Sequence, residues 1–159
     1  MRQKKQRQLS PSFAMAAANT TMSEMRKLLE RGLQMDLKDD RHGLTPLHWA
    51  AGFNHRPGII QMLLDAGADM EARAGRWDNT PLHEACRNKN AENKNTAVIR
   101  FLLEAGADVN ARNKGGHSPI DILLGKMIYS DDLDHFEQIL DLFREYAPEL
   151  VMEAWCKQT

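Results

Sequence analysis

Apolar residues recur at spacings of three and four along several short stretches of this chain, and polar segments separate the stretches. Three stripes have this spacing, and they consist of Met22, Met25, Leu28 and Leu29, then Ile59, Ile60, Leu63 and Leu64, and then Phe136, Ile139, Leu140 and Phe143. Such a spacing places apolar side chains on one face of a helix, so each stripe predicts an amphipathic helix. Because each stripe is short, the helices must pack on one another to bury these faces.

Two near-identical sequence motifs predict the start of a second kind of helix, which is short and rich in small residues. The motifs are Thr45-Pro46-Leu47-His48-Trp49-Ala50 and Thr80-Pro81-Leu82-His83-Glu84-Ala85. In each, the threonine hydroxyl can cap the first free amides of a helix, and the proline suits the first helical position because an N–H there has no partner. A weaker start of the same kind follows at Ser118-Pro119-Ile120-Asp121. Short helices therefore alternate with the amphipathic ones.

A second repeated phrase predicts where the amphipathic helices end. It occurs as Leu63-Leu64-Asp65-Ala66-Gly67-Ala68-Asp69 and as Leu102-Leu103-Glu104-Ala105-Gly106-Ala107-Asp108, and its glycine lies where a left-handed backbone is favoured. The threonine-led starts are 35 residues apart, and the serine-led start follows 38 residues later. A repeat of this length with Thr-Pro-Leu-His-x-Ala resembles the ankyrin repeat. The resemblance covers about residues 20–145, is most specific over 43–112, and implies an all-α solenoid of stacked helix-turn-helix units with projecting hairpin loops.

The resemblance divides the chain into about four repeats, of which two are strong and two are caps. The predicted segments are a disordered basic tail over 1–9, a degenerate N-terminal capping repeat over 10–41, a repeat over 42–76, a repeat over 77–115 with an inserted loop at 88–95, and a degenerate C-terminal repeat with a capping helix over 116–159. The inserted loop is polar, and lengthening such a loop costs little free energy. Leu63, Leu64, Leu102 and Leu103 are expected at the seams between repeats.

Composition and charge exclude few classes of protein. Among 159 residues, 21 basic and 22 acidic residues give a formal net charge of -1, which favours neither a nucleic-acid nor a membrane partner. No apolar run is long enough to insert across a bilayer. Two cysteines do not make a disulfide framework, so we expect a reducing, intracellular location in the cytoplasm, with the nucleus as the alternative. The basic start of the chain leaves a nuclear-import or anionic-surface signal open.

No pattern in the chain predicts catalysis. It has neither a glycine-rich phosphate loop nor a nucleophile elbow, and its cysteines have no activating neighbours in sequence. His48 and His83 suggest a metal site, but no cysteine or carboxylate cluster stands at ligand spacing beside them. In the ankyrin pattern this histidine is structural, with its ring bonded to neighbouring backbone. We therefore expect a protein that is not an enzyme and that has no cofactor and no metal site.

The ankyrin resemblance also implies where a partner protein would bind, namely the hairpin tips and the exposed side of the first helices, which line a concave groove. Carried over position by position, the tips supply Arg41, His42, Arg73, Arg76, Trp77, Arg112 and Lys114, and the first helices supply Trp49, Phe53, Glu84, Arg87 and Asn88. These tip residues would form a positive ribbon, and the three aromatic residues would be open to the groove. Aromatic and arginine side chains dominate interface energies.

These residues predict a non-catalytic protein-protein interaction module, a scaffold, adaptor or inhibitor, whose partner segment carries apolar anchors and acidic neighbours. One alternative is an anionic ligand, either a nucleic acid or a phosphorylated protein, bound by the basic ribbon. Another is that Trp49 packs on the adjacent helix while the arginines are merely solvated. Trp77 lies in a hairpin one residue longer than the family pattern, so its ring can also cover the neighbouring hairpin.

Overall fold

A computed structural model describes residues 12–54, 56–87, 95–127 and 133–156. Its helices are α1 (Ser12–Ala16), α2 (Met22–Glu30), α3 (Pro46–Phe53), α4 (Pro57–Asp65), α5 (Pro81–Arg87), α6 (Thr96–Glu104), α7 (Pro119–Met127), α8 (Leu133–Tyr146) and α9 (Pro148–Cys156). Within the described residues no strand forms, apart from a single antiparallel bridge between Ala74 and Asn79. The predicted all-α fold is confirmed, whereas the tail over 1–9 and most of the inserted loop lie outside the described residues.

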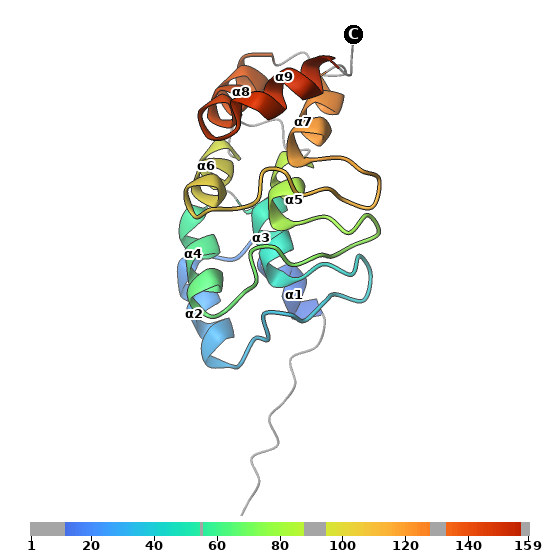
Figure 1. The fold of residues 1–159 in the computed structure, drawn as a ribbon. Helices are drawn as coiled ribbons and strands as arrows, with labels where there is room; N and C mark the ends of the chain where they lie inside the picture. The colour runs from blue at the N-terminus through green and yellow to red at the C-terminus, as the bar shows by residue number, and fades with distance from the viewer. Residues whose placement is uncertain (1–11, 55, 88–94, 128–132, 157–159) are drawn as a thin grey trace, which may run out of the picture.

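The helices form two layers that run along the molecule (Figure 1). The first layer is a stack of α1, α3, α5 and α7, and the second is a stack of α2, α4, α6 and α8. The segments after α2, α4 and α6 project sideways from the stack as hairpins, and α9 packs on α7 and α8 at the C-terminal end. Each helix pair with its hairpin is one unit of the predicted solenoid. None of the described helices is long and apolar enough to cross a membrane.

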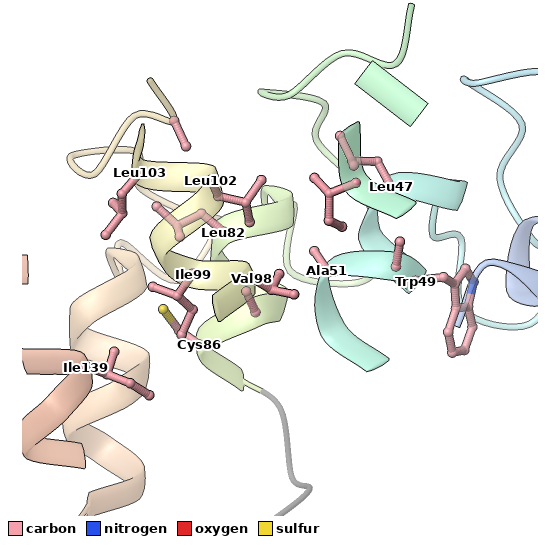
Figure 2. Packing of buried hydrophobic residues seen from close by; sticks show 14 of the residues in the cluster. Leu47, Trp49, Ala51, Leu82, Cys86, Val98, Ile99, Leu102, Leu103 and Ile139 are labelled. Carbon is pink, nitrogen blue, oxygen red and sulfur yellow. The ribbon is translucent and has the colours of Figure 1, made fainter. Parts of the chain in front are cut away.

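The core lies between the two layers, where apolar side chains of the second helices meet the small residues of the first (Figure 2). Leu63, Ile99 and Leu102 have no exposed surface. Ala51 and Cys86 occupy matching positions of α3 and α5, and both are buried, so Cys86 fills the position of a small apolar residue. Burial raises the pKa of the Cys86 thiol, which leaves the group protonated and unreactive at neutral pH.

The predicted stripes are buried except at their margins. Phe136 and the other three residues of the C-terminal stripe are buried. Met22 is exposed, in contrast to Met25, because it stands at the first position of α2, where no preceding turn covers it. Leu64 packs only partly on the core, whereas Leu63 is fully buried. At the matching positions of α6, by contrast, Leu102 and Leu103 are both buried.

The glycines that follow α4 and α6 have the predicted backbone conformation, whereas the N-cap threonine of α3 does not have its predicted role. Gly67 and Gly106 both have φ of +92°, the left-handed backbone expected after a helix. Thr45 is the N-cap of α3, but its hydroxyl makes no bond to a backbone N–H of the first turn. The hydroxyl oxygen instead lies 2.7 Å from Nδ1 of His48. The predicted capping role of Thr45 is therefore wrong, because the buried ring three residues later takes its hydrogen bond.

His48 and His83 each form a hydrogen bond with the hairpin of the next repeat. Nε2 of His48 lies 2.8 Å from the carbonyl oxygen of Asn79, and Nε2 of His83 lies 3.0 Å from that of His117. The backbone N–H of Thr80 donates to Nδ1 of His83, so Nε2 carries the ring proton. Burial lowers the pKa of His48 and of His83, and both rings are neutral at pH 7. Their predicted structural role is confirmed, and in the described residues no three His, Cys, Asp or Glu side chains are placed to hold a metal ion.

Candidate partner-binding groove

We call the surface formed by the first helices α3, α5 and α7 and the three hairpins over 36–45, 71–80 and 110–118 the groove. Figure 1 shows the hairpins projecting beside these helices. Backbone hydrogen bonds join neighbouring hairpins. The N–H of Gly75 donates to the carbonyl of Gly43 at 3.0 Å, and the N–H of Lys114 donates to the carbonyl of Trp77 at 2.8 Å. The three hairpins are therefore joined into one continuous surface, which we call the hairpin wall. Its backbone hydrogen bonds hold neighbouring hairpins beside one another.

Trp49 lies beneath the groove surface, so the expectation that it is open to the groove is wrong. Only 6% of Trp49 is exposed, and Figure 2 shows its indole at the margin of the buried cluster. The indole N–H donates to Oδ2 of Asp39 at 2.9 Å. The ring of His42 meets the indole edge-on at 5.1 Å between centroids, and the ring of Phe53 lies tilted against it at 5.0 Å. Trp49 is buried because Asp39 supplies the acceptor that its N–H requires.

Asp39 is the acceptor around which the first hairpin turns, and the sequence analysis missed it. Its carboxylate accepts the backbone N–H groups of Arg41, His42 and Leu44 at 3.0, 2.7 and 2.9 Å. Burial alone would raise the pKa of Asp39, but these bonds and the indole N–H outweigh burial and hold its pKa below the ordinary value. Asp39 is therefore ionised at neutral pH. An aspartate inside a turn is a common sequence signal for such bonds, and it could have identified this residue.

A depression of about 270 Å³ lies in the groove between α3 and α5, and we call it the α3–α5 pocket. Its walls come from the first hairpin and from both helices, and the residues are His42, Leu44, Trp49, Gly52, Phe53, Glu84 and Arg87. Phe53 is 36% exposed, and the side chain of Arg87 is 43% exposed. The pocket therefore presents an aromatic ring and a guanidinium group to solvent, as the sequence analysis predicted for these two residues.

Glu84 and Arg87 form an ion pair in which only the arginine is accessible. Glu84 is 3% exposed, so the expectation that it faces the groove openly is wrong. Its Oε1 accepts from the side-chain amide of Asn79 at 2.7 Å, and its Oε2 accepts from Nε and Nη2 of Arg87 at 3.0 and 2.7 Å. A buried carboxylate needs these partners to stay charged. Glu84 therefore positions the guanidinium of Arg87 within the pocket.

Two arginines predicted to contact a partner also make hydrogen bonds within the stack. Nη1 of Arg73 donates to the carbonyl of Arg112 at 2.5 Å, and Nη1 of Arg112 donates to Oδ2 of Asp121 at 2.8 Å. At the matching position of the preceding hairpin, Nζ of Lys38 donates to the carbonyl of Arg73 at 3.1 Å. Lys38 and Arg73 thus each reach the next hairpin, whereas Arg112 bonds to α7, the helix that follows its own hairpin. Both arginines remain exposed, and the bonds described here involve Nη1 of each guanidinium.

Asp121 explains why the third start departs from the Thr-Pro-Leu-His pattern. It stands in α7 where His48 stands in α3, and after α7 the described chain continues as α8 and α9. Its Oδ2 accepts from the backbone N–H and the hydroxyl of Ser118, both at 2.8 Å, as well as from Arg112. The carboxylate of Asp121 thus caps α7 and accepts a hydrogen bond from Arg112, the last of the three basic hairpin residues described above.

The remaining predicted tip residues are exposed along the hairpin wall. Trp77 is 49% exposed, and the guanidinium of Arg76 lies 5.6 Å from the centroid of its ring. Arg41, His42 and Lys114 are exposed on the flanking hairpins. Trp77 is thus an accessible aromatic residue, whereas Asn88, also predicted as a contact, lies outside the described residues. Phe53 thus lines the α3–α5 pocket, whereas Trp77 and several cationic side chains are exposed on the hairpins.

The hairpins as a whole carry almost balanced charge, although the tip residues singled out from the sequence are mostly basic. Over 36–45, 71–80 and 110–118 there are six basic and five acidic residues. The prediction counted only selected tip positions. Two of the six basic residues, Arg73 and Arg112, are also engaged in the contacts described above.

The family model described as ankyrin repeats, in three copies, matches residues 13–113, which is more than half of the chain. The matched segment begins within α1, contains α2 to α6 and the first two hairpins, and ends within the third hairpin. No curated protein matches the chain.

Proposed function

This chain belongs to the ankyrin-repeat family, whose members are generally protein-protein interaction modules, and we propose that it binds a segment of a partner protein in the groove described above. The observation that carries the proposal is the α3–α5 pocket beside a rigid hairpin wall. Phe53 in the pocket and Trp77 on the middle hairpin are exposed, although burying a large apolar surface away from water lowers the free energy. Exposed aromatic and arginine side chains are typical of interface hot spots.

The partner segment that fits this groove carries apolar anchors with acidic neighbours. Arg41, Arg76, Arg87 and Lys114 are exposed along the groove. Glu84, by contrast, is buried and holds internal hydrogen bonds. Exposed Asp40 and Asp78 reduce the excess of positive charge, so electrostatic attraction supplements apolar contact and does not replace it. We propose a role without catalysis, as a scaffold, adaptor or inhibitor, with no cofactor and in the cytoplasm.

An anionic ligand such as a nucleic acid or a phosphorylated protein is less well supported. Such binding would depend on a run of free basic side chains, and its affinity would fall steeply with salt. The hairpins have nearly balanced charge, and Arg73 and Arg112 donate hydrogen bonds within the stack. Binding by the groove should instead persist at moderate salt because apolar contacts are hardly screened.

Site-specific photo-crosslinking in a lysate of the source cells tests the proposed function. A benzophenone amino acid replaces Trp77 in one variant and Gln61 in another, and both are irradiated at low and moderate salt. Trp77 lies on the hairpin wall, whereas Gln61 is exposed on α4, in the other helix layer. We expect one protein to crosslink through position 77 and not through position 61, and to be lost when Phe53→Ala is added. Equal crosslinking through both positions, or nucleic acid as the main adduct, would contradict the proposal.

A further inference from the structure

The α3–α5 pocket specifies more than a general contact surface. On the basis of the function proposed above, we propose that this pocket receives one large apolar side chain of the partner, and that a carboxylate next to that side chain in the partner binds Arg87. The partner is thereby defined as a segment in which a leucine, phenylalanine or tryptophan stands within a few residues of an aspartate or glutamate.

The size and lining of the pocket suit a single apolar side chain. Its volume of about 270 Å³ exceeds the roughly 150 Å³ of a protein cavity that accommodates benzene. The rings of Trp49 and Phe53, tilted by 37° to each other, supply aromatic lining, and Leu44 supplies aliphatic lining. Phe53 is 36% exposed in the absence of a partner. Insertion of an apolar side chain would remove this surface from water, which is the main source of affinity at such anchors.

Glycine at position 52 keeps the pocket open although the fold does not require it. A Cβ atom built on Gly52 would lie 3.5 Å from Cβ of Glu84 and 3.6 Å from its carbonyl oxygen, both ordinary contact distances. Glycine is less stable than alanine inside a helix, so this position sacrifices helix stability where alanine would fit. The glycine instead leaves space in the pocket. Gly125 stands at the matching position of α7, where no atom lies within 4 Å of such a Cβ.

Arg87 determines the charge of the group beside the anchor. Among the residues that line the pocket, the carboxylate of Glu84 is buried and satisfied by Asn79 and Arg87. The exposed formal charge of the lining is therefore that of Arg87. Because Glu84 already holds Nε and Nη2, the guanidinium loses little conformational freedom when its exposed part binds a carboxylate.

Selection from a random library of twelve-residue peptides displayed on phage, with the full chain as bait, tests this assignment. We expect enriched peptides to share one large apolar residue with an Asp or Glu within four positions. The affinity of a synthetic consensus peptide, measured by isothermal titration calorimetry, should fall at least about tenfold when its apolar residue becomes alanine. Replacement of its acidic residue by the matching amide should weaken binding by about threefold to tenfold.

Matched variants of the protein locate the anchor. Gly52→Ala should weaken peptide binding by at least about threefold because its methyl group occupies the pocket, whereas Gly125→Ala should leave the affinity within about twofold of the parent. Both substitutions should keep or raise the melting temperature, so a lost affinity cannot reflect unfolding. Phe53→Ala should weaken binding at least about tenfold, and Gly52→Ala decides the question if the phenylalanine variant folds poorly.

The outcomes separate this inference from the proposed function. Peptides that bind Gly52→Ala and Phe53→Ala as well as the parent, but are weakened by Trp77→Ala, would overturn the pocket assignment and leave groove binding intact. Enriched peptides that lack an apolar residue would also overturn the pocket assignment. Peptides that are insensitive to every groove variant, or a selection that enriches none, would overturn both.

Discussion

Replacing Trp49 by phenylalanine should destabilise the protein strongly, although both residues are aromatic and apolar. The substitution removes the indole N–H that donates to the buried carboxylate of Asp39 at 2.9 Å. Asp39 keeps its three backbone donors but loses the side-chain donor that lies beneath the groove. A hydrogen bond to a charged group contributes about 1.5–3 kcal/mol, and the smaller ring leaves a gap that adds roughly 1 kcal/mol.

The expected loss is therefore about 2.5–4 kcal/mol, a large fraction of the roughly 5–15 kcal/mol that stabilises a typical domain. With a urea dependence of about 2 kcal/mol per molar, the unfolding midpoint should fall by about 1–2 M. The pKa of Asp39 is lower in the folded than in the unfolded protein, so its ionised form stabilises the fold above the unfolded pKa of about 3.9. This stabilisation is lost as the pH falls through the folded pKa of Asp39. The difference in unfolding free energy between Trp49→Phe and the parent should then narrow.

Urea unfolding followed by circular dichroism at pH 7, with a second series below pH 4, measures both effects. Trp77→Phe is the matched control, because that indole is 49% exposed and its removal should change stability by less than about 0.5 kcal/mol. Equal midpoints for Trp49→Phe and Trp77→Phe at pH 7 would show that the bond to Asp39 does not stabilise the fold. A deficit that stayed constant as the pH fell through the folded pKa of Asp39 would show that the ionised carboxylate is not the cause.

Three further outcomes follow from packing and charge. Leu63→Ala should cost about 2–5 kcal/mol of unfolding free energy and Leu64→Ala clearly less, because only the former is fully buried; equal losses in urea titrations would contradict this assignment. Burial lowers the pKa values of His48 and His83, so below about pH 6.5 the unfolded chain takes up protons before the folded one does. The unfolding free energy should therefore fall as the pH drops below about 6.5, and an unfolding free energy that stayed constant from pH 7.5 to 5.5 would disprove this expectation. Arg73→Ala should cost about 0.5–1.5 kcal/mol by removing its bond to the next hairpin, yet leave the affinity of a groove-binding peptide unchanged in calorimetry.

The repeat architecture could be predicted because its signals are local. Proline at the first position of a helix, glycine just past its end and apolar residues three and four apart each depend on neighbours within a few residues. The helix starts at Pro46, Pro81 and Pro119 and the left-handed glycines at 67 and 106 are therefore where the sequence places them. The burial of Cys86 at a position for a small apolar residue also follows from its match to Ala51 one repeat earlier.

The groove was harder to predict because exposure there depends on contacts between distant residues. Phe53, Arg87 and Trp77 are exposed as expected. Trp49 and Glu84 occupy comparable positions of α3 and α5 but are buried, because Asp39, Asn79 and their neighbours in the hairpins supply hydrogen-bond partners. No periodicity in the chain distinguishes an aromatic residue that meets solvent from one that a hairpin covers.

The amino-acid sequence alone thus specifies the repeating helix pairs, their order and the family, since short-range backbone preferences and apolar spacing are sufficient for each. Stacking of the repeats specifies which side chains remain available to a partner. His48 meets the backbone 31 residues further along, and Arg73 meets a carbonyl 39 residues further along. Such contacts form only once neighbouring repeats are packed at a fixed distance, and they decide which polar and aromatic groups are buried within the stack and which are left in the groove.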